Sequence, residues 1–276
     1  MAFKYFSKNG KILPIEQAVI SLSNIEYAYG FGVYENIRIL NDQAFFLKDH
    51  IERLIKSAKI IKITHPFDTT FVENSVLELI KNTKPGTYNL KILLIGSSTK
   101  EKSSLYIFCL NPLFPDKKLY QNGAKLITYH YERDFPQAKT LNMLQSYLAF
   151  NKARESDAYD ALLINKNSFI TEGTRTNFFC LKDKTIYSPP EKDILLGVMR
   201  KAMFKVALKN NYQMMEKNIR LEEINSYDAA FVTSSSSKII PVRSIDNHLL
   251  KPIPEHLKKL MVLLNEFLKN YGGKME

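Results

Sequence analysis

Apolar side chains recur at helical spacing in two segments near the start of the chain. Residues 47–61, LKDHIERLIKSAKII, carry an apolar stripe along one helical face. A second helix is predicted over residues 70–82, with Asp68 or Thr69 as its N-cap. The continuous apolar runs YNLKILLIG and SSLYIFCL then predict two strands. The first 113 residues are therefore predicted to form a small α+β domain that opens with short strands and turns.

A polar, proline-containing stretch separates this domain from the rest of the chain. NPLFPDKKLYQNG is rich in turn residues and predicts a linker over residues 114–122. Beyond it, helices are predicted directly after Lys139, over residues 199–210 and over residues 254–271. Strands are predicted in AKLITYHY, DALLIN, SFIT, NFFCLK, TIYS, AAFVT and KIIPVRSI. Residues 123–276 are therefore predicted to form a second α+β domain.

Composition narrows the class of protein. The chain is 45% hydrophobic and 24% charged, as in ordinary globular proteins, and no window approaches the roughly 18 apolar residues of a membrane helix. The N-terminus, MAFKYFSKNGKILP, lacks a secretory apolar block. The net charge of +11 is dispersed, with acids beside most lysines and no nucleic-acid-binding signature. We expect a cytoplasmic protein with neither a nucleic acid nor a membrane as partner.

Cysteine and histidine are too sparse and too scattered for a metal site. Cys109 and Cys180 each lie within an apolar, strand-like run and are expected to be buried thiols. The five histidines form no HxH or HxxxH pair, so no zinc site is expected.

Lys139 is the last charge before the uncharged run TLNMLQSYLAFN, which ends at Lys152. A lysine at this position can simply cap a helix edge. Burial, however, disfavours the charged form of an amine, and a neutral lysine is a nucleophile that forms Schiff bases with carbonyl compounds. The remaining motifs decide between these two interpretations.

Four further segments contain residues that could bind a ligand with a phosphate group and a protonated ring nitrogen. Glu172, in FITEGTRTNFF, is predicted to lie in a turn between two strand-like runs; a carboxylate there is structural, solvated or able to stabilise a protonated ring nitrogen. Arg53, in HIERL, either pairs with Asp49 on its helix or binds phosphate in a forked geometry. VTSSSSK is either a flexible loop or a source of hydroxyl and amide donors, and LLGVMRKAM predicts a helix N-terminus that attracts anions.

Together these motifs resemble the class IV, or fold type IV, pyridoxal-phosphate aminotransferases. The matching segments are YGFGVYENIRIL, HIERLIKSAKII, AKTLNML, ITEGTRTNFF, LLGVMR and FVTSSSSKIIPVRSID, in the order and spacing of the family. The resemblance implies a small α+β N-terminal domain. It also implies a C-terminal domain that is built on a partly open β-barrel and carries the Schiff-base lysine. A homodimer with the site between the domains is implied as well.

The resemblance also implies the roles of individual residues. Lys139 would form the internal aldimine with pyridoxal 5′-phosphate, and Glu172 would pair with the pyridine nitrogen. Arg53 would hold the phosphate, helped by the residues that offer a hydroxyl or backbone amides: Ser235, Val198 and Met199. An amino acid and a 2-oxo acid such as 2-oxoglutarate would then exchange an amino group through aldimine and ketimine steps in a ping-pong reaction.

The substrate side is less completely specified. YENIR is similar to the motif of branched-chain aminotransferases, which implies that Tyr29, Tyr34 and Arg38 lie near the substrate pocket. Ser236 is expected at the substrate as well. The alternatives of the same fold are aminodeoxychorismate lyase, which releases pyruvate, and D-amino-acid aminotransferase, whose Arg-x-His pair is absent from LLIGSSTK.

Two basic residues stand out from the family pattern. Arg175, in TEGTRTNFF, either binds a substrate carboxylate or pairs with an acid at the surface. Lys91, in NLKILLIG, is similar to a basic residue near the lyase active site.

Overall fold

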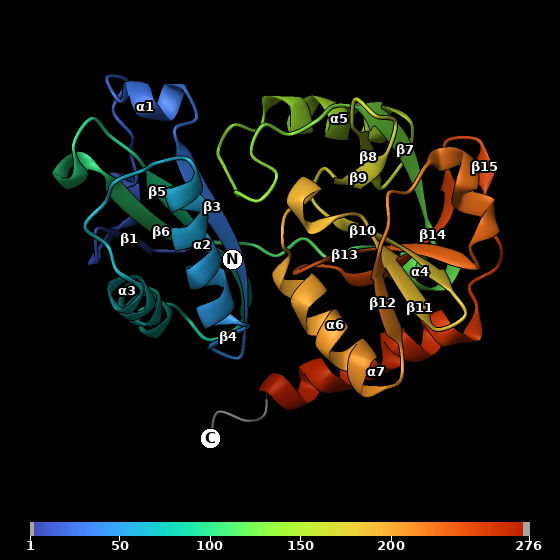
Figure 1. Cartoon of the computed structure of the whole chain (residues 1–276). Coiled ribbons are helices and arrows are strands. Elements are labelled where there is room, and N and C mark those ends of the chain that lie inside the picture. Colours follow the sequence, from blue (N-terminus) through green and yellow to red (C-terminus); the bar gives the residue numbers. More distant parts are fainter. Residues whose placement is uncertain (1–2, 273–276) are drawn as a thin grey trace. The chain divides into compact units, whose positions relative to one another are not determined.

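The computed structural model describes residues 3–272 and contains two compact units (Figure 1). Unit 1 holds the residues up to Leu113 together with Ala138–Met143, and unit 2 holds Phe114–Gln137 and the residues from Leu144 onwards. The predicted boundary after residue 113 coincides with the first of these divisions. The segment around Lys139 differs from the sequence expectation, because it belongs to unit 1 and not to the C-terminal domain.

Unit 1 is built on a six-stranded sheet in the order β2-β1-β6-β5-β3-β4, with every neighbouring pair antiparallel. Its longest pairing joins β3 to β5, from Gly32 opposite Ile95 to Leu40 opposite Thr87. The strands are β1 (Tyr5–Lys8), β2 (Lys11–Pro14), β3 (Gly32–Leu40), β4 (Gln43–Ala44), β5 (Thr87–Ile95) and β6 (Ser104–Leu110).

Helices α2 (Leu47–Ile60) and α3 (Thr69–Lys81) cover one face of this sheet (Figure 1). Both helices confirm the sequence prediction to within one or two residues, and the Asp68 side chain caps α3 by accepting from the Phe71 N–H. Their apolar stripes meet the sheet in a core that includes Leu54, Val76, Ile92 and Leu94, all fully buried. Burial of such side chains contributes about 1.5–3 kcal/mol each.

The opposite face of the sheet carries a second, smaller apolar cluster. Tyr34, Leu93 and Tyr106 lie there, with Leu141 and Met143 packed against them. Leu141 reaches this face because residues 138–143 run beside β3: Thr140 bridges Val33, and the Leu141 N–H donates to the Gly32 carbonyl at 2.8 Å. This backbone pairing is the physical reason why the Lys139 segment belongs to unit 1.

Unit 2 is built on a nine-stranded sheet that curls into a barrel. Its central strands follow the order β10-β13-β14-β7-β8-β9, and β9 pairs back to β10 through a single residue pair, Glu172 opposite Asn177. This limited closure agrees with the expected partly open barrel. The strands are β7 (Ala124–His130), β8 (Asp160–Ile164), β9 (Ile170–Gly173), β10 (Asn177–Lys182), β11 (Thr185–Ser188), β12 (Gln213–Glu216), β13 (Ala229–Ser234), β14 (Lys238–Ile245) and β15 (His248–Leu249).

Three longer helices pack around the strands of unit 2. Helix α5 (Leu144–Glu155) lies on β7 and β8 through the small side chains of Ala149 and Ala153, which allow close approach. Helix α6 (Val198–Lys209) packs on β13, and α7 (Glu255–Gly272) lies along α6 (Figure 1). The buried stripe of α7 comprises Leu257, Leu260, Leu264 and Leu268.

Several short elements were not anticipated. The predicted linker contains helix α4 (Lys117–Asn122), capped by the Asp116 side chain. Strands β12 and β15 carry too few apolar residues to be recognised by periodicity. The other short helices are α1 (Ile25–Ala28), η1 (Ile15–Gln17), η2 (Lys100–Lys102), η3 (Glu191–Asp193) and η4 (Leu221–Ser226).

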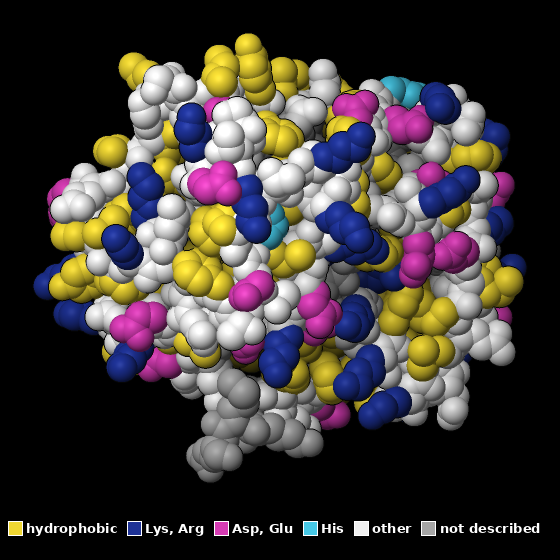
Figure 2. Space-filling view, turned by 60° about the vertical axis from the view of Figure 1, so that its left-hand side comes forward, with side chains coloured by type: hydrophobic (Ala, Val, Ile, Leu, Met, Phe, Trp, Pro, Cys, Tyr) yellow, Lys and Arg dark blue, Asp and Glu magenta, His cyan; other side chains and the backbone are white. Residues whose placement is uncertain are grey.

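Surface charge follows the dispersed pattern of the sequence. On the face shown in Figure 2, Lys and Arg side chains alternate with acidic and apolar ones and form no single basic patch. Within the described range, no helix is long and apolar enough to cross a membrane. The same residues contain no group of three or more His, Cys, Asp or Glu side chains that could hold a metal ion.

Candidate active site

The backbone of Lys139 is held from two sides within unit 1. Its carbonyl accepts the Tyr34 N–H at 2.9 Å, and its own N–H donates to Ser57 Oγ of α2 at 3.1 Å. Ser57 is fully buried, so this contact is shielded from water. The residue is therefore extended rather than helical, and the predicted helix begins only at Leu144.

The amine of Lys139 lies over an aromatic ring. Its Nζ is 4.5 Å from the centroid of the Tyr34 ring, a distance at which the ring face attracts a cation. Lys91 Nζ lies 5.4 Å from the same centroid. Lys91 comes from β5, where it is paired with Asn36 of β3, so its side chain shares a sheet face with Tyr34.

This face of β3 collects several of the predicted substrate residues. Tyr34, Asn36 and Arg38 alternate along the strand and therefore point to the same side as Lys91. Tyr29 is the C-cap residue of α1, and 76% of its surface is exposed. The structure thus places Tyr34, Arg38 and Lys91 on one face of the sheet, with the Lys139 amine over the Tyr34 ring, and the role of Tyr29 stays a prediction.

The opposite side of β3 carries a buried ion-pair network that sequence reasoning missed. Glu35 is fully buried and accepts from Arg53 Nε and Nη2, each at 2.7 Å, and from His50 Nδ1 at 2.7 Å. Burial by itself raises the pKa of Glu35, but the Arg53 charge and the His50 contact outweigh it and lower the pKa to about 2. Burial also lowers the pKa of His50, so the imidazole is neutral near pH 7. Glu35 therefore fixes the orientation of the arginine predicted to hold phosphate.

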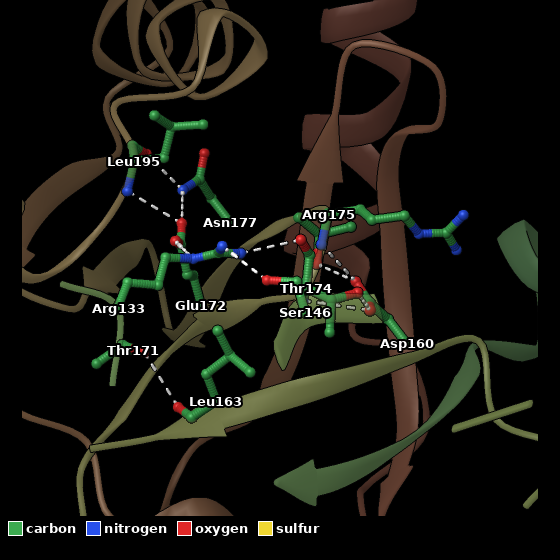
Figure 3. Close-up of polar contacts among 11 residues, drawn as sticks. Arg133, Ser146, Asp160, Leu163, Thr171, Glu172, Thr174, Arg175, Asn177 and Leu195 are labelled. Atoms are coloured by element: carbon green, nitrogen blue, oxygen red, sulfur yellow. Dashed lines mark hydrogen bonds and ion pairs between the residues drawn. The ribbon is translucent and has the colours of Figure 1, made fainter. Parts of the chain in front are cut away.

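Glu172 lies within strand β9 and not in the predicted turn, because it pairs with Asn177 of β10 where the barrel of unit 2 closes (Figure 3). The residue is 3% exposed. Its Oε1 accepts from Arg133 Nε at 2.8 Å, and its Oε2 accepts from the Leu195 N–H at 3.0 Å and from Asn177 Nδ2 at 3.3 Å. These donors stabilise an ionised carboxylate, the form that can hold a proton on a neighbouring ring nitrogen.

Arg133 is a site residue that the sequence did not single out. Besides Glu172, it donates from Nη1 to Ser146 Oγ at 2.8 Å and from Nη2 to the Thr174 carbonyl at 3.0 Å (Figure 3). One guanidinium thus links Glu172, the start of α5 and the turn after β9. In the sequence it is one arginine among many, six positions before Lys139, and nothing local marks it.

The start of α6 offers backbone amides for an anion. Gly197 is the N-cap and has no side chain to accept the first amides of the helix, which belong to Val198 and Met199. A side chain at Gly197 would overlap Asn177 Oδ1, so the close approach of these two segments requires glycine. The sequence expectation of a helix N-terminus at this point is confirmed, with a start one residue earlier.

The serine turn is ordered by its own hydrogen bonds. Ser234 Oγ accepts the Ser237 N–H at 3.1 Å, and the Tyr120 hydroxyl donates to the Ser237 carbonyl at 3.0 Å. Ser235 is half-buried and Ser236 is exposed. Thr233, just before the turn, is 1% exposed, and its hydroxyl has no hydrogen-bond partner among the described residues. A buried hydroxyl without a partner beside other hydroxyls is the kind of donor that a bound anion would satisfy.

Arg175 points away from Glu172 (Figure 3). Its guanidinium carbon lies 3.8 Å from the centroid of the Phe150 ring of α5, and Nη2 donates to the Tyr159 carbonyl at 3.3 Å. Arg175 is exposed to solvent. These contacts supply a structural role for Arg175, and its predicted role at a substrate carboxylate stays a prediction.

Each unit therefore contains polar groups that could bind a ligand. Unit 1 supplies an amine over an aromatic ring and an oriented arginine; unit 2 supplies a buried carboxylate, the first amides of a helix and hydroxyl donors. Taken one by one, these groups are of the kinds that pyridoxal phosphate requires for its reactive carbonyl, its protonated ring nitrogen and its phosphate.

Comparison with known proteins agrees with this chemistry. The sequence model of the family "Amino-transferase class IV" matches residues 32–245. The chain is 29% identical, over 97% of both chains, to a putative branched-chain-amino-acid aminotransferase of Methanocaldococcus jannaschii. It is 30% identical, over 88% of both chains, to a D-alanine aminotransferase of Bacillus licheniformis.

Structural similarity extends over nearly the whole chain. The branched-chain amino acid aminotransferase of Thermobaculum terrenum, solved in its PLP form, superposes with a TM-score of 0.84 and 23% identity, covering 98% of this chain and 94% of the other. The family match spans well over half of the sequence, and the observed α+β fold with its barrel is that of fold type IV. The chain belongs to the class IV aminotransferases.

Proposed function

We propose that this aminotransferase uses pyridoxal 5′-phosphate to move an amino group from an amino acid to a 2-oxo acid. The observation that carries the proposal is the two-sided hold on the Lys139 backbone, with its amine 4.5 Å from the Tyr34 ring centroid. The backbone contacts fix where the Lys139 side chain begins, and the ring contact shows where its amine lies. The Thermobaculum terrenum enzyme, solved in its PLP form, supports the same cofactor.

The phosphate would be held by Arg53, by the Ser235 hydroxyl and by the amides of Val198 and Met199. Glu35 keeps the Arg53 guanidinium in one orientation through a bidentate contact, which lowers the entropy lost on binding. The hydroxyl of Thr233 is a further candidate donor, because it is buried without a partner among the described residues.

The bound cofactor supplies an electron sink that stabilises negative charge at the substrate Cα. Glu172 would keep the ring nitrogen protonated, and Arg133 would hold the Glu172 carboxylate ionised from behind. Lys139 would bond to the cofactor's aldehyde carbon in the resting enzyme. The Lys139 amine would also serve as the general base that takes the proton from the substrate Cα.

The substrate carboxylate needs cations. Lys91 Nζ lies against the same Tyr34 ring as the Lys139 amine and fits this role, and Arg38 lies on the same face of the sheet, four residues further along β3. Ser236 and Tyr29 stay predicted substrate residues. Branched-chain amino acids are candidate donors and 2-oxoglutarate a candidate acceptor. Relatives of both the branched-chain and the D-alanine kind leave the choice of substrate to experiment.

A homodimer is part of the proposal. Leu22 is fully exposed, and Val19, Ile25 and Tyr29 of the same stretch are at least half exposed. On α5, Leu144 and Tyr147 expose 64% and 61% of their surfaces. Apolar side chains exposed in this way are typical of an interface with another chain. The expected cytoplasmic location stays a prediction.

Absorbance and a substrate panel test the proposal. Purified protein given pyridoxal phosphate should turn yellow, and it should transfer amino groups from one or more of a panel of amino acids, offered as both enantiomers, to 2-oxoglutarate. Lys139→Ala should keep the fold, seen by circular dichroism, and lose transfer. Release of pyruvate from aminodeoxychorismate without transfer would identify the lyase instead. A colourless, inactive wild-type protein would reject the proposal.

A further inference from the structure

Asp160 is a fully buried carboxylate with no ion pair to any described residue. It lies at the start of β8 and is 0% exposed. Its Oδ1 accepts from the N–H groups of Ala161 at 2.9 Å and Thr174 at 3.3 Å and from the Thr174 hydroxyl, while Oδ2 accepts from the Thr176 hydroxyl at 2.9 Å and the Arg175 N–H at 3.4 Å. A buried charge is tolerated only when donors surround it in this way.

Nearly all of these donors belong to the turn that follows Glu172. The hydroxyls of Thr174 and Thr176 donate to the carboxylate, whereas the Arg175 guanidinium lies over the Phe150 ring. Figure 3 shows Thr174 beside Asp160 and the Arg175 side chain directed away from it. Gly173 lies between Glu172 and this turn, and a side chain on it would overlap the Thr176 hydroxyl and the Asp160 carboxylate. The turn is therefore wrapped tightly around one side chain.

The same turn also controls the partner of Glu172. Arg133 donates from Nη2 to the Thr174 carbonyl and from Nε to Glu172 Oε1, so its guanidinium is located by both. Movement of residues 174–176 would displace the Thr174 carbonyl, then Arg133, and finally the Glu172 carboxylate. The backbone holds the turn as well, because the Gly173 N–H donates to the Thr176 carbonyl at 2.8 Å and the Thr174 N–H donates to the Ala161 carbonyl at 3.0 Å.

We propose that Asp160 is a positioning residue that fixes the Glu172 carboxylate by holding the Thr174–Thr176 turn. This inference rests on the proposed function, because Glu172 matters to the reaction only if it holds the cofactor's ring nitrogen. Asp160 would act through this turn and not by its own contact with cofactor or substrate. A displacement of Glu172 by about 1 Å is enough to cost up to about a hundredfold in turnover.

Thr176→Val and Asp160→Asn disturb the turn to different degrees. Thr176→Val removes one hydroxyl donor, and Thr176→Ser retains it. Asp160→Asn replaces one carboxylate oxygen by an NH2 group. If this group takes the place of Oδ2, it faces the Arg175 N–H, and two donors then oppose each other. Asp246→Asn is the matched control, since Asp246 also accepts from a threonine, from Thr128 N–H at 2.9 Å and Oγ1 at 2.6 Å, but directly after β14 rather than beside Glu172.

Each variant is measured with and without cofactor. Urea unfolding of the cofactor-free protein reports the fold. The rate of cofactor loss on dialysis and the pH at which the visible absorption of the bound cofactor changes both report the Glu172 contact. Steady-state kinetics then separate kcat from KM for the amino donor.

The expected pattern separates positioning from general stability. Asp160→Asn and Thr176→Val should lower kcat about tenfold to a hundredfold, speed cofactor loss and shift the pH of the absorption change, with KM altered less than about twofold. Thr176→Ser and Asp246→Asn should resemble wild type in all of these. Wild-type absorption and kinetics in both Asp160→Asn and Thr176→Val, or equal effects in Asp246→Asn, would overturn the inference. A wild-type protein that binds no cofactor would instead reject the proposed function.

Discussion

Substitution of Glu35 by glutamine tests the buried network behind β3. The carboxylate is fully buried and has a pKa of about 2 in place of its ordinary 4.5, because Arg53 and His50 outweigh the effect of burial. At about 1.4 kcal/mol for each pKa unit, this difference corresponds to about 3 kcal/mol of stability at pH 7. Removal of one partner from a buried ion pair costs about 3–5 kcal/mol, which agrees with that figure. Glu35→Gln should therefore lower the free energy of unfolding by about 3 kcal/mol.

The sign of the pH dependence follows from the lowered pKa. The stabilisation is fully present above the ordinary pKa of 4.5, where Glu35 is ionised in both states, and it is lost as the pH falls through about 2. Urea unfolding of wild type and Glu35→Gln between pH 7 and pH 2 measures the difference. Glu16→Gln, at an exposed position of unit 1, is the control and should match wild type. A difference below about 1 kcal/mol at pH 7, or one that stays constant down to pH 2, would refute the reasoning.

Three further predictions follow from single contacts. Gly173→Ala should lower stability by about 1–3 kcal/mol in urea unfolding, because the new methyl group overlaps the Asp160 carboxylate; an unchanged midpoint would contradict this. Cys109 and Cys180 are buried, and burial raises the pKa of both thiols, that of Cys109 to about 11. Iodoacetamide at pH 8 should therefore label them, by mass spectrometry, only after unfolding, and rapid labelling of the native protein would argue against their burial. Arg175→Ala should raise KM for the carboxylate substrate about tenfold with the cofactor absorption unchanged, whereas unaltered kinetics would leave Arg175 with only its structural contacts, such as that with Phe150.

Helix positions in unit 1 were predictable because their signals are local. The apolar stripe of α2 and the Asp68 cap of α3 are properties of consecutive residues, and both helices lie within one or two residues of the prediction. The order of motifs along the chain likewise led to the class IV family through resemblance. These features need no knowledge of the tertiary structure.

The surroundings of Lys139 could not be predicted in the same way. The uncharged run after it predicts a helix at once, yet residues 139–141 are extended, because their backbone pairs with β3, which is distant in the sequence. Because of this pairing with β3, Lys139 belongs to unit 1 and not to the C-terminal domain in which the sequence predicts it. Periodicity cannot report a partner that is distant in sequence.

The residues that support the candidate site were missed for the same reason. Arg133 reaches Glu172 across 39 positions, and Arg53 reaches Glu35 across 18. Asp160 looks like one more acid before an apolar strand, although it holds the turn next to Glu172. A side chain whose role is to orient another side chain has no recognisable pattern in a single sequence, because its partner is distant along the chain.

The most direct test of the account identifies the lysine that bonds to the cofactor. Purified protein is incubated with pyridoxal phosphate, reduced with borohydride, digested, and analysed by mass spectrometry for the phosphopyridoxyl group. We expect this group on Lys139 in stoichiometric amount and its loss in Lys139→Ala, with Lys91 unmodified. Stoichiometric modification of another lysine, or none in a protein that still transfers amino groups, would contradict the assignment of Lys139.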